Sequence, residues 1–123
     1  MAWEVSLHDA VDSWFVRLSQ DEPEIADQVA AAIDKLEADG PTLGRPLVDR
    51  IKQSKHHNMK ELRPRTDGET EIRILFAFDL EREAILLVAG DKTGTWNKWY
   101  DENVPVADAR FDEHLKRLNE GEK

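Results

Sequence analysis

The chain has 123 residues, 40% of them hydrophobic, and its net charge of −9 argues against general affinity for nucleic acid. This length predicts one domain over residues 1–119, followed by a polar tail at residues 120–123. The chain has no cysteine, which excludes disulfide bonds and thiolate metal sites, and it shows neither a leader nor a membrane-spanning apolar run, so we expect a soluble cytoplasmic protein.

The first forty residues are predicted to form a strand and two helices. Residues 3–7 alternate between apolar and polar side chains, which is typical of a strand with one buried face. Apolar residues then recur at helical spacing over residues 11–18 and 25–36. Pro23 suits the first turn of the second helix, and Gly40-Pro41 is a typical end for it.

The middle of the chain is predicted to be a loop followed by three strands. Residues Gly40 to Asn58 contain chain breakers and no sustained period, so we expect a surface loop. Strands are predicted over Met59–Arg63, Glu71–Asp79 and Glu83–Lys92, and a turn at Thr66-Asp67-Gly68 separates the first two. Such short connections favour antiparallel neighbours.

The alternation in the middle strand predicts which face of the sheet is covered. Ile72, Ile74, Phe76 and Phe78 share the face that the helices should cover. The open face is then left with Glu71, Arg73, Leu75 and Ala77. A last helical pattern is expected to begin at Pro105 and to run to Leu118. The predicted fold is α+β with two layers: an N-terminal strand and two helices on one face of an antiparallel sheet, plus a C-terminal helix.

The charges are strongly segregated along the chain. Residues 45–65 contain seven Lys and Arg residues against Asp49 and Glu61, a net charge of +5. Residues 21–39 contain seven acidic residues against Lys35, a net charge of −6, and are interpreted as solvated helix faces. The basic segment is therefore the predicted nucleic-acid side of an acidic protein.

Four segments, taken in order, resemble the phage-derived, HigB-like branch of the RelE/ParE toxins. They are Leu36–Val48, Met59–Arg63, Ile72–Asp79 and Leu87–Thr93, and the resemblance covers roughly residues 12–118. It implies a RelE-like fold and a toxin that a cognate antitoxin neutralises, often a helix-turn-helix protein through which the complex reaches operator DNA. RelE-like and HigB-like members cut mRNA on the ribosome, whereas ParE-like members poison DNA gyrase.

RNA cleavage by side chains alone needs a base, an acid and cations that stabilise the phosphoryl charge. Arg73 is the first candidate, because a guanidinium on an open sheet face can clamp a phosphate. The resemblance also implies a phosphate-contacting arginine at this position. The alternative is a cross-strand ion pair with a neighbouring glutamate, and a guanidinium locked into carboxylates beneath a helix would argue against the nuclease hypothesis.

Further candidates lie before and after this strand. Strict alternation places Lys60 and Arg63 on opposite faces, so either a bulge intervenes or only one of them belongs to the site. Lys92 follows the last strand, where the family commonly has basic residues, although a solvated turn lysine is the alternative. His57 and His56 carry the imidazole suited to proton transfer, and HigB-like toxins use a histidine nearby; exposed loop histidines are the alternative.

Aromatic residues and lysines complete the predicted site. Trp96, Lys98 and Tyr100 have a composition that can stack a base and place a phenol near the phosphate, although tryptophans often pin a terminal segment instead. The predicted catalytic residues are Arg73, Lys60, Arg63, Lys92, His57 and Tyr100, with Asp91 as a minor candidate. The predicted RNA-binding residues are Lys52, Lys55, His56, Arg65, Trp96 and Lys98. No metal or other cofactor is expected.

The sequence hypothesis is thus a toxin of a type II toxin–antitoxin module that acts as a ribosome-dependent mRNA endoribonuclease and inhibits translation. Dependence on the ribosome would offset the acidic charge, because the ribosome can present and orient the strand. Two alternatives remain open: a ParE-like DNA gyrase inhibitor, and a catalytically inactive component that only binds the antitoxin and acts in repression.

Overall fold

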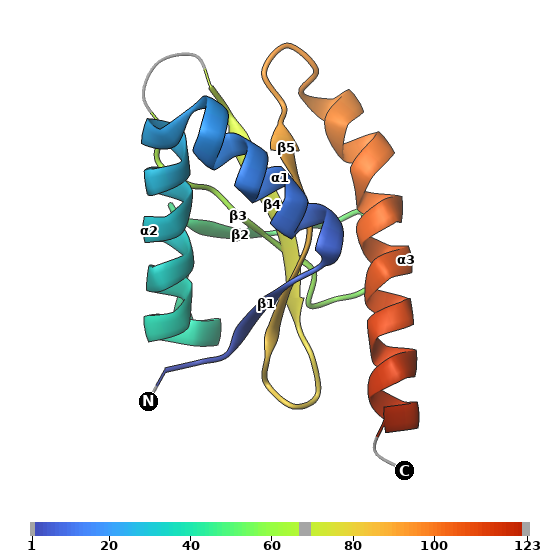
Figure 1. The fold of residues 1–123 in the computed structure, drawn as a ribbon. Helices are drawn as coiled ribbons and strands as arrows, with labels where there is room; N and C mark the ends of the chain where they lie inside the picture. Colours follow the sequence, from blue (N-terminus) through green and yellow to red (C-terminus); the bar gives the residue numbers. More distant parts are fainter. Residues whose placement is uncertain (1, 67–69, 122–123) are drawn as a thin grey trace.

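Five strands form one mixed sheet in the computed structural model, which describes residues 2–66 and 70–121 (Figure 1). Their spatial order is β1 (Val5–Leu7), β5 (Ala84–Asp91), β4 (Ile72–Phe78), β3 (Lys60–Leu62) and β2 (Val48–Arg50). The strands β3, β4 and β5 pair antiparallel, as predicted from their short connections. The first strand instead pairs parallel with β5, so the sheet as a whole is not antiparallel.

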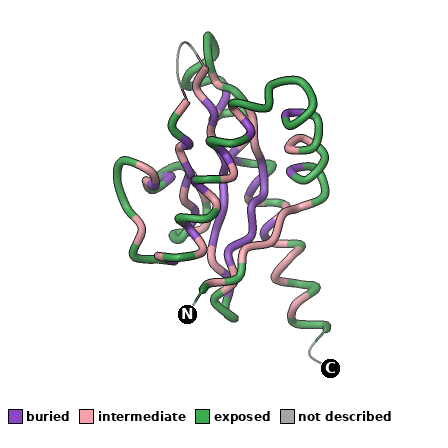
Figure 2. Tube along the Cα trace, turned by 60° about the vertical axis from the view of Figure 1, so that its left-hand side comes forward, coloured by how far each residue is buried: buried purple, intermediate pink, exposed green. Residues whose placement is uncertain are grey.

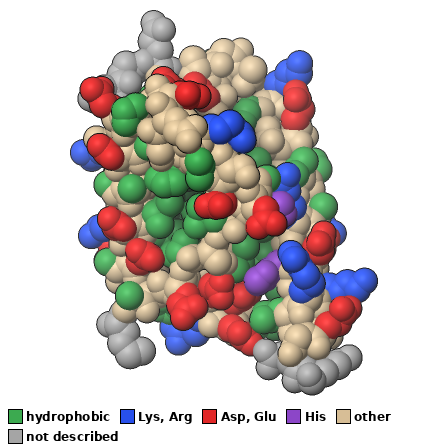
Figure 3. All heavy atoms as spheres, viewed as in Figure 1, with side chains coloured by type: hydrophobic (Ala, Val, Ile, Leu, Met, Phe, Trp, Pro, Cys, Tyr) green, Lys and Arg blue, Asp and Glu red, His purple; other side chains and the backbone are tan. Residues whose placement is uncertain are grey.

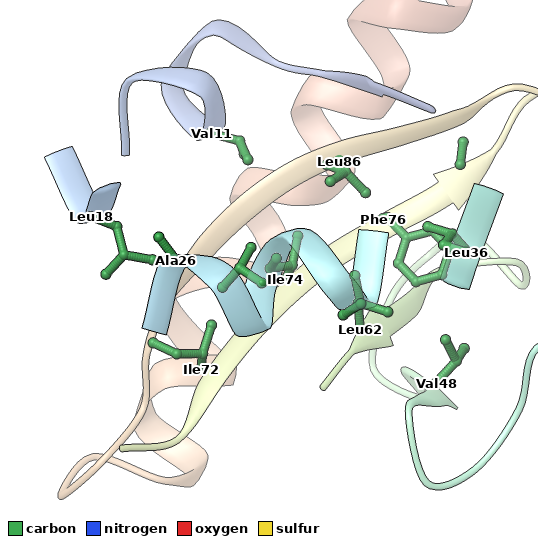
Figure 4. Close-up of a cluster of buried hydrophobic side chains, with 13 residues drawn as sticks. Val11, Leu18, Ala26, Leu36, Val48, Leu62, Ile72, Ile74, Phe76 and Leu86 are labelled. Carbon is green, nitrogen blue, oxygen red and sulfur yellow. The ribbon is translucent and has the colours of Figure 1, made fainter. Parts of the chain in front are cut away.

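Helices α1 (Asp9–Asp21) and α2 (Pro23–Asp39) cover the predicted face of the sheet, and a short 3-10 helix, η1 (Gly40–Thr42), follows. The fully buried Ile74 and Phe76 of β4 lie there in one hydrophobic cluster with Ala26 and Leu36 of α2 (Figure 4). The buried residues follow the central strands, whereas the outer helix faces are exposed (Figure 2). No helix in the described part of the chain has the length and apolar character needed to cross a membrane.

The opposite face of the sheet is not open, and in this the prediction was wrong. Helix α3 (Asn97–Gly121) lies across it and buries Leu75 and Ala77 together with Phe111. The molecule therefore has three layers, with two helices on one side and α3 on the other (Figure 1). The physical reason is visible in β4, since apolar residues on both faces of a strand require cover on both sides.

The last helix begins eight residues before Pro105, at Asn97. Its first turns are held by Trp99 and Val104, which belong to the same buried cluster as Phe111. Pro105 is exposed on the outer side of the helix, where packing against the sheet is not disturbed. The helix continues to Gly121 and so includes residues 120 and 121 of the predicted polar tail, while residues 122–123 lie outside the described residues.

The predicted surface loop contains a strand. Residues Val48–Arg50 form β2 and pair antiparallel with β3, with Val48 opposite Leu62. Three residues are too few to show a period, so this strand could not be recognised from alternation. Of the predicted turn at 66–68, Asp67 and Gly68 lie outside the described residues.

Candidate active site

A nearly buried glutamate lies at the centre of the predicted site. Glu61 of β3 is only 3% exposed and points to the α3 side of the sheet, opposite Leu75 in the β3–β4 register. Its carboxylate accepts hydrogen bonds from Tyr100 Oη at 2.6 Å and from Arg63 Nη2 at 3.0 Å. We call Glu61, Arg63, Arg73, Lys92 and Tyr100 the Glu61 cluster.

Three strands and one helix bring these side chains together. Arg63 follows β3 two residues after Glu61 and therefore shares its face. Arg73 pairs in register with Gly90 at the neighbouring end of β5, and Lys92 follows that strand directly. Tyr100 lies in the first turn of α3, which packs against the same end of the sheet (Figure 1).

Gly90 determines how closely the first turn of α3 approaches the sheet. A Cβ atom at this position would lie 2.9 Å from Nε1 of Trp99, a distance that real Cβ contacts essentially never show. The indole of Trp99 thus occupies the space that any other residue at position 90 would fill. This contact places the neighbouring Tyr100 over the sheet, within reach of Glu61.

Arg73 forms the ion pairs that the alternative interpretation foresaw. Its Nη2 lies 3.0 Å from Glu71 Oε2, its Nε lies 3.5 Å from Glu61 Oε1, and Nη1 donates to its neighbour's carbonyl. The side chain is only 14% exposed, and Nε has no hydrogen-bond partner within residues 2–66 and 70–121. In the free protein its guanidinium is therefore held by carboxylates, which is the arrangement stated above to argue against the nuclease hypothesis. Arg73 can bind a phosphate only if it exchanges one of these carboxylates for it.

Lys92 and Tyr100 have altered acid–base properties in this setting. Burial and the charge of Arg73 hold the pKa of Lys92 below its usual value, although Glu61 and Glu71 act in the opposite direction. Burial and the hydrogen bond to Glu61 raise the pKa of Tyr100 to about 12. Lys92 can therefore lose its proton more readily than an ordinary lysine, whereas Tyr100 stays protonated.

The charges of the cluster are nearly balanced. Its three cations, Arg63, Arg73 and Lys92, face the carboxylate of Glu61, while Glu71 and Asp49 pair with the two arginines at the rim. The positive charge that the sequence places in this region is thus largely neutralised within the protein. A polyanion must compete with these carboxylates in order to bind.

Two aromatic rings flank Lys92 at the outer edge of the cluster. The ammonium nitrogen lies 4.7 Å from the ring centroid of Trp96 and 5.1 Å from that of Tyr100. Trp96 is 55% exposed, whereas Lys98 extends into solvent and pairs loosely with Glu102. Trp96 is the member of the predicted aromatic segment that lies exposed beside the cluster.

Asp91 organises the turn that carries Lys92. Its Oδ1 accepts hydrogen bonds from the backbone N–H groups of Glu71 and Thr93. Although burial raises the pKa of Asp91, the hydrogen bonds from Thr93 and Glu71 bring it below its ordinary value. These contacts indicate a structural role for this minor candidate.

The predicted histidines lie at the other end of α3. His56 Nε2 lies 2.8 Å from Asp112 Oδ1, and its ring packs edge-on against Phe111. Lys55 also pairs with Asp112, and Ser54 donates to Asp108. We call Ser54, Lys55, His56, Asp108 and Asp112 the His56 cluster. Tyr100 and Asp112 are twelve positions apart in α3, about 18 Å along the helix axis, so the two clusters are distinct.

The other predicted residues are also remote from the Glu61 cluster. Lys60 faces the α1–α2 side of the sheet, where its ammonium lies 5.8 Å from the ring of Phe78. Thus only Arg63 of the pair Lys60 and Arg63 belongs to the cluster, as alternation allows. His57 and Lys52 are exposed on the loop, and Arg65 is exposed beside α2.

Sequence reasoning missed Glu61, the residue on which the cluster converges. It was counted only as a charge opposing the basic segment, although it lies two residues before Arg63 and so on the same face of a strand. That spacing was the available signal. The burial of Glu61 could not be foreseen, because it depends on α3 covering a face that was expected to be open.

Comparisons with known proteins place the chain among relatives. Residues 13–112 match the family described as phage-derived, Gp49-like proteins. A Mycobacterium tuberculosis protein provisionally named toxin HigB3 is 53% identical over 111 residues, which cover 90% of this chain and 92% of that protein. A second protein of that organism, provisionally named toxin HigB2, is 48% identical over 112 residues, 91% of this chain but 54% of that protein. No solved structure matches significantly.

Proposed function

Since the chain belongs to the Gp49-like, phage-derived family, among the HigB-like toxins of toxin–antitoxin modules, we propose that it is an mRNA endoribonuclease acting on the ribosome. One observation carries this proposal. Two arginines, a lysine of lowered pKa and a protonated tyrosine converge around Glu61. These are the residue types that RNA cleavage by side chains requires.

The reaction assigned to the cluster is attack of an RNA 2′-oxygen on the adjacent phosphorus. The bond from phosphorus to the 5′-oxygen breaks, and the products are a 2′,3′-cyclic phosphate and a 5′-hydroxyl. In the proposal Lys92 accepts the proton of the 2′-hydroxyl. Tyr100 donates the one proton of its hydroxyl to the departing 5′-oxygen, after this hydroxyl has turned from the carboxylate of Glu61. Arg73 and Arg63 stabilise the charge on the phosphoryl oxygens.

The ion pairs of Arg73 set a condition on RNA binding. Its Nη2 must exchange the carboxylate of Glu71 for a phosphoryl oxygen, and Glu71 is exposed enough, at 36%, to move into solvent. Acidic side chains are also spread over the face that α1 and α2 present, which repels RNA from that side (Figure 3). Both features favour a strand delivered and oriented by the ribosome over free RNA.

The partners follow from the same proposal. The substrate in this proposal is translated mRNA in the cytoplasm. Trp96 lies exposed beside Lys92 and is suited to stack against one of its bases. A cognate antitoxin of the helix-turn-helix type neutralises the toxin, and operator DNA is reached only through that complex. The names of the relatives support a toxin and therefore an antitoxin partner, whereas the mRNA substrate is proposed from the Glu61 cluster.

Induced expression of the chain without an antitoxin tests the proposal. Translation should stop and translated mRNA should be cut, and Arg73→Ala should lower cleavage by about 10²- to 10³-fold, the usual loss when one charge-stabilising group is removed. Arg17→Ala, on the exposed outer side of α1, is the matched control and should remain toxic. Circular dichroism verifies that both variants are folded.

Three outcomes would contradict the proposal. Undiminished cleavage by a folded Arg73→Ala variant would remove this arginine from the mechanism. DNA cleaved and covalently linked to gyrase, with intact mRNA, would select a ParE-like inhibitor instead. Normal growth on induction of the unmodified chain would indicate an inactive component that only binds the antitoxin.

A further inference from the structure

Glu61 is an unusual residue to bury between strands and a helix. Removal of an ionised carboxylate from water is unfavourable unless ion pairs and hydrogen bonds replace the lost hydration. Here both oxygens are engaged. Oε1 accepts from Tyr100 Oη at 2.6 Å and faces Arg73 Nε at 3.5 Å, while Oε2 accepts from Arg63 Nη2 at 3.0 Å and Nε at 3.3 Å.

The same carboxylate cannot contact a bound RNA directly. Glu61 is 3% exposed, and its two oxygens are already shared among three side chains from two strands and α3. Any effect on a reaction must therefore pass through Arg63, Arg73 and Tyr100. Long arginine side chains sample many rotamers when they are not held, so a common acceptor fixes their relative geometry before substrate arrives.

We propose that Glu61 is the positioning residue of this site, whose buried carboxylate fixes the guanidinium groups of Arg63 and Arg73 and the phenol of Tyr100 in their reactive arrangement. The inference rests on the proposed function and adds the group that assembles its active site. Glu61 also keeps the phenol protonated, since a neighbouring negative charge opposes formation of the phenolate.

The chain offers a direct readout because it contains one tyrosine. The near-ultraviolet absorbance of tyrosinate in the full-length protein therefore reports Tyr100 alone. Glu61→Gln should lower the pH at which this signal appears by about one unit or more, since it removes both the charge and the anionic acceptor. Burial remains, so the midpoint should stay above that of a free tyrosine.

Glu71→Gln is the matched control for this titration. It removes the same charge from a residue that also pairs with Arg73, but the pairing of Glu71 is with Nη2, and its side chain is 36% exposed. The tyrosinate signal of Glu71→Gln should appear at nearly the same pH as in the unmodified chain. An equal shift in both variants would point to overall charge instead of the hydrogen bond between Glu61 and Tyr100.

Cleavage kinetics on programmed ribosomes provide the second readout. Glu61→Gln should lower kcat by roughly 10²-fold with a smaller change in KM, since misplaced reactive groups affect the chemical step most. Glu61→Asp keeps the charge on a shorter side chain. In Glu61→Asp the pH midpoint of the Tyr100 titration should stay raised, because the charge is kept. Most of the cleavage activity should be lost, because the shorter side chain cannot hold the same groups in place.

The outcomes separate this inference from the proposed function. Unchanged titration and kinetics in a natively folded Glu61→Gln variant overturn the role of Glu61 while cleavage by the unmodified chain upholds the function. Absence of cleavage by the unmodified chain overturns the function, whereas a lowered titration in Glu61→Gln still supports Glu61 as the group that holds Tyr100. If Glu61→Gln does not fold, Glu61→Asp decides: wild-type cleavage by that variant overturns the inference.

Discussion

Polar side chains join both ends of α3 to the rest of the fold, but in opposite ways. At the first end the acceptor is Glu61 on the sheet, 3% exposed, and the donors converge on it. At the other end the acceptors, Asp108 and Asp112, are on the helix, and a loop donates to them. The side chain of Asp112 is 42% exposed, so this second junction is solvated.

The difference shows that burial of the acceptor carboxylate, more than the number of cations around it, distinguishes the candidate site from a structural contact. Lys55 belongs to the most basic segment of the chain, yet its ammonium is taken up by Asp112. Lys92 belongs to a turn with little net charge, yet burial and Arg73 lower its pKa. Net charge along the sequence therefore does not distinguish the two ends of α3, since Arg63 of the Glu61 cluster belongs to the same basic segment as Lys55.

The largest expected effect in this comparison is a loss of RNA cleavage on substitution of Lys92. Lys92→Arg keeps the positive charge but cannot release a proton near neutrality, so cleavage should fall by roughly 10²-fold or more. In the unmodified chain the rate should rise with pH until Lys92 has lost its proton, below the usual lysine value of 10.5, and then level off. Lys92→Arg should lack this rise.

Single-turnover cleavage over a range of pH checks this expectation. The matched control is Lys116→Arg, an exposed lysine in the other half of α3, which should keep both the rate and its pH dependence. Full activity of Lys92→Arg at all pH values would reduce Lys92 to a source of charge.

A smaller effect, on stability, is expected at the far end of the sheet. Asp79 closes the turn between β4 and β5: its carboxylate accepts from the N–H groups of Glu81 and Glu83 and lies 2.9 Å from His114 Nε2. Its side chain is 1% exposed. Asp79→Ala should therefore lower the free energy of unfolding by about 3 kcal/mol, as expected for lost hydrogen bonds to a buried charge.

Chemical denaturation at an unchanged m-value measures this loss. Ribosomal cleavage by the folded fraction should stay near that of the unmodified chain, because Asp79 is remote from the Glu61 cluster. A folded Asp79→Ala protein that cleaves poorly would show that the two ends of α3 are coupled.

The smallest effect is expected from Glu71, which competes with phosphate for Arg73. Glu71→Gln should tighten RNA binding by a factor of roughly two to five, the equivalent of a partly exposed ion pair. Asp112→Asn removes the same charge at the other end and should leave affinity unchanged. Binding to programmed ribosomes at fixed salt compares the two variants. Equal changes in both would point to overall charge instead of a local exchange.

Much of the fold follows from local sequence patterns. The alternation of β4 correctly placed Ile74 and Phe76 under the helices, and short connections correctly indicated antiparallel strands. The open face was wrong because Leu75 and Ala77 were assigned to solvent in spite of their apolar character. The start of α3 was also wrong, since proline was treated as a beginning although Pro105 lies on an exposed helix side.

The candidate site was foreseen only in part. Arg63, Arg73, Lys92 and Tyr100 lie together, because strand alternation and register largely determine where they point. His57 and its loop could not be placed, since a segment without a period gives no direction. The same limit hid the polar contacts of the loop with α3, which join residues more than fifty positions apart.

The contact between Gly90 and Trp99 has a consequence for how this scaffold can vary. A methyl group at position 90 would clash with the indole of Trp99 and push it away from the sheet, since its carbon would lie 2.9 Å from Nε1. The first turn of α3 would tilt outward and carry the phenol away from its acceptor. The absence of a single side chain at position 90 thus limits the reactive geometry as firmly as the charged groups do.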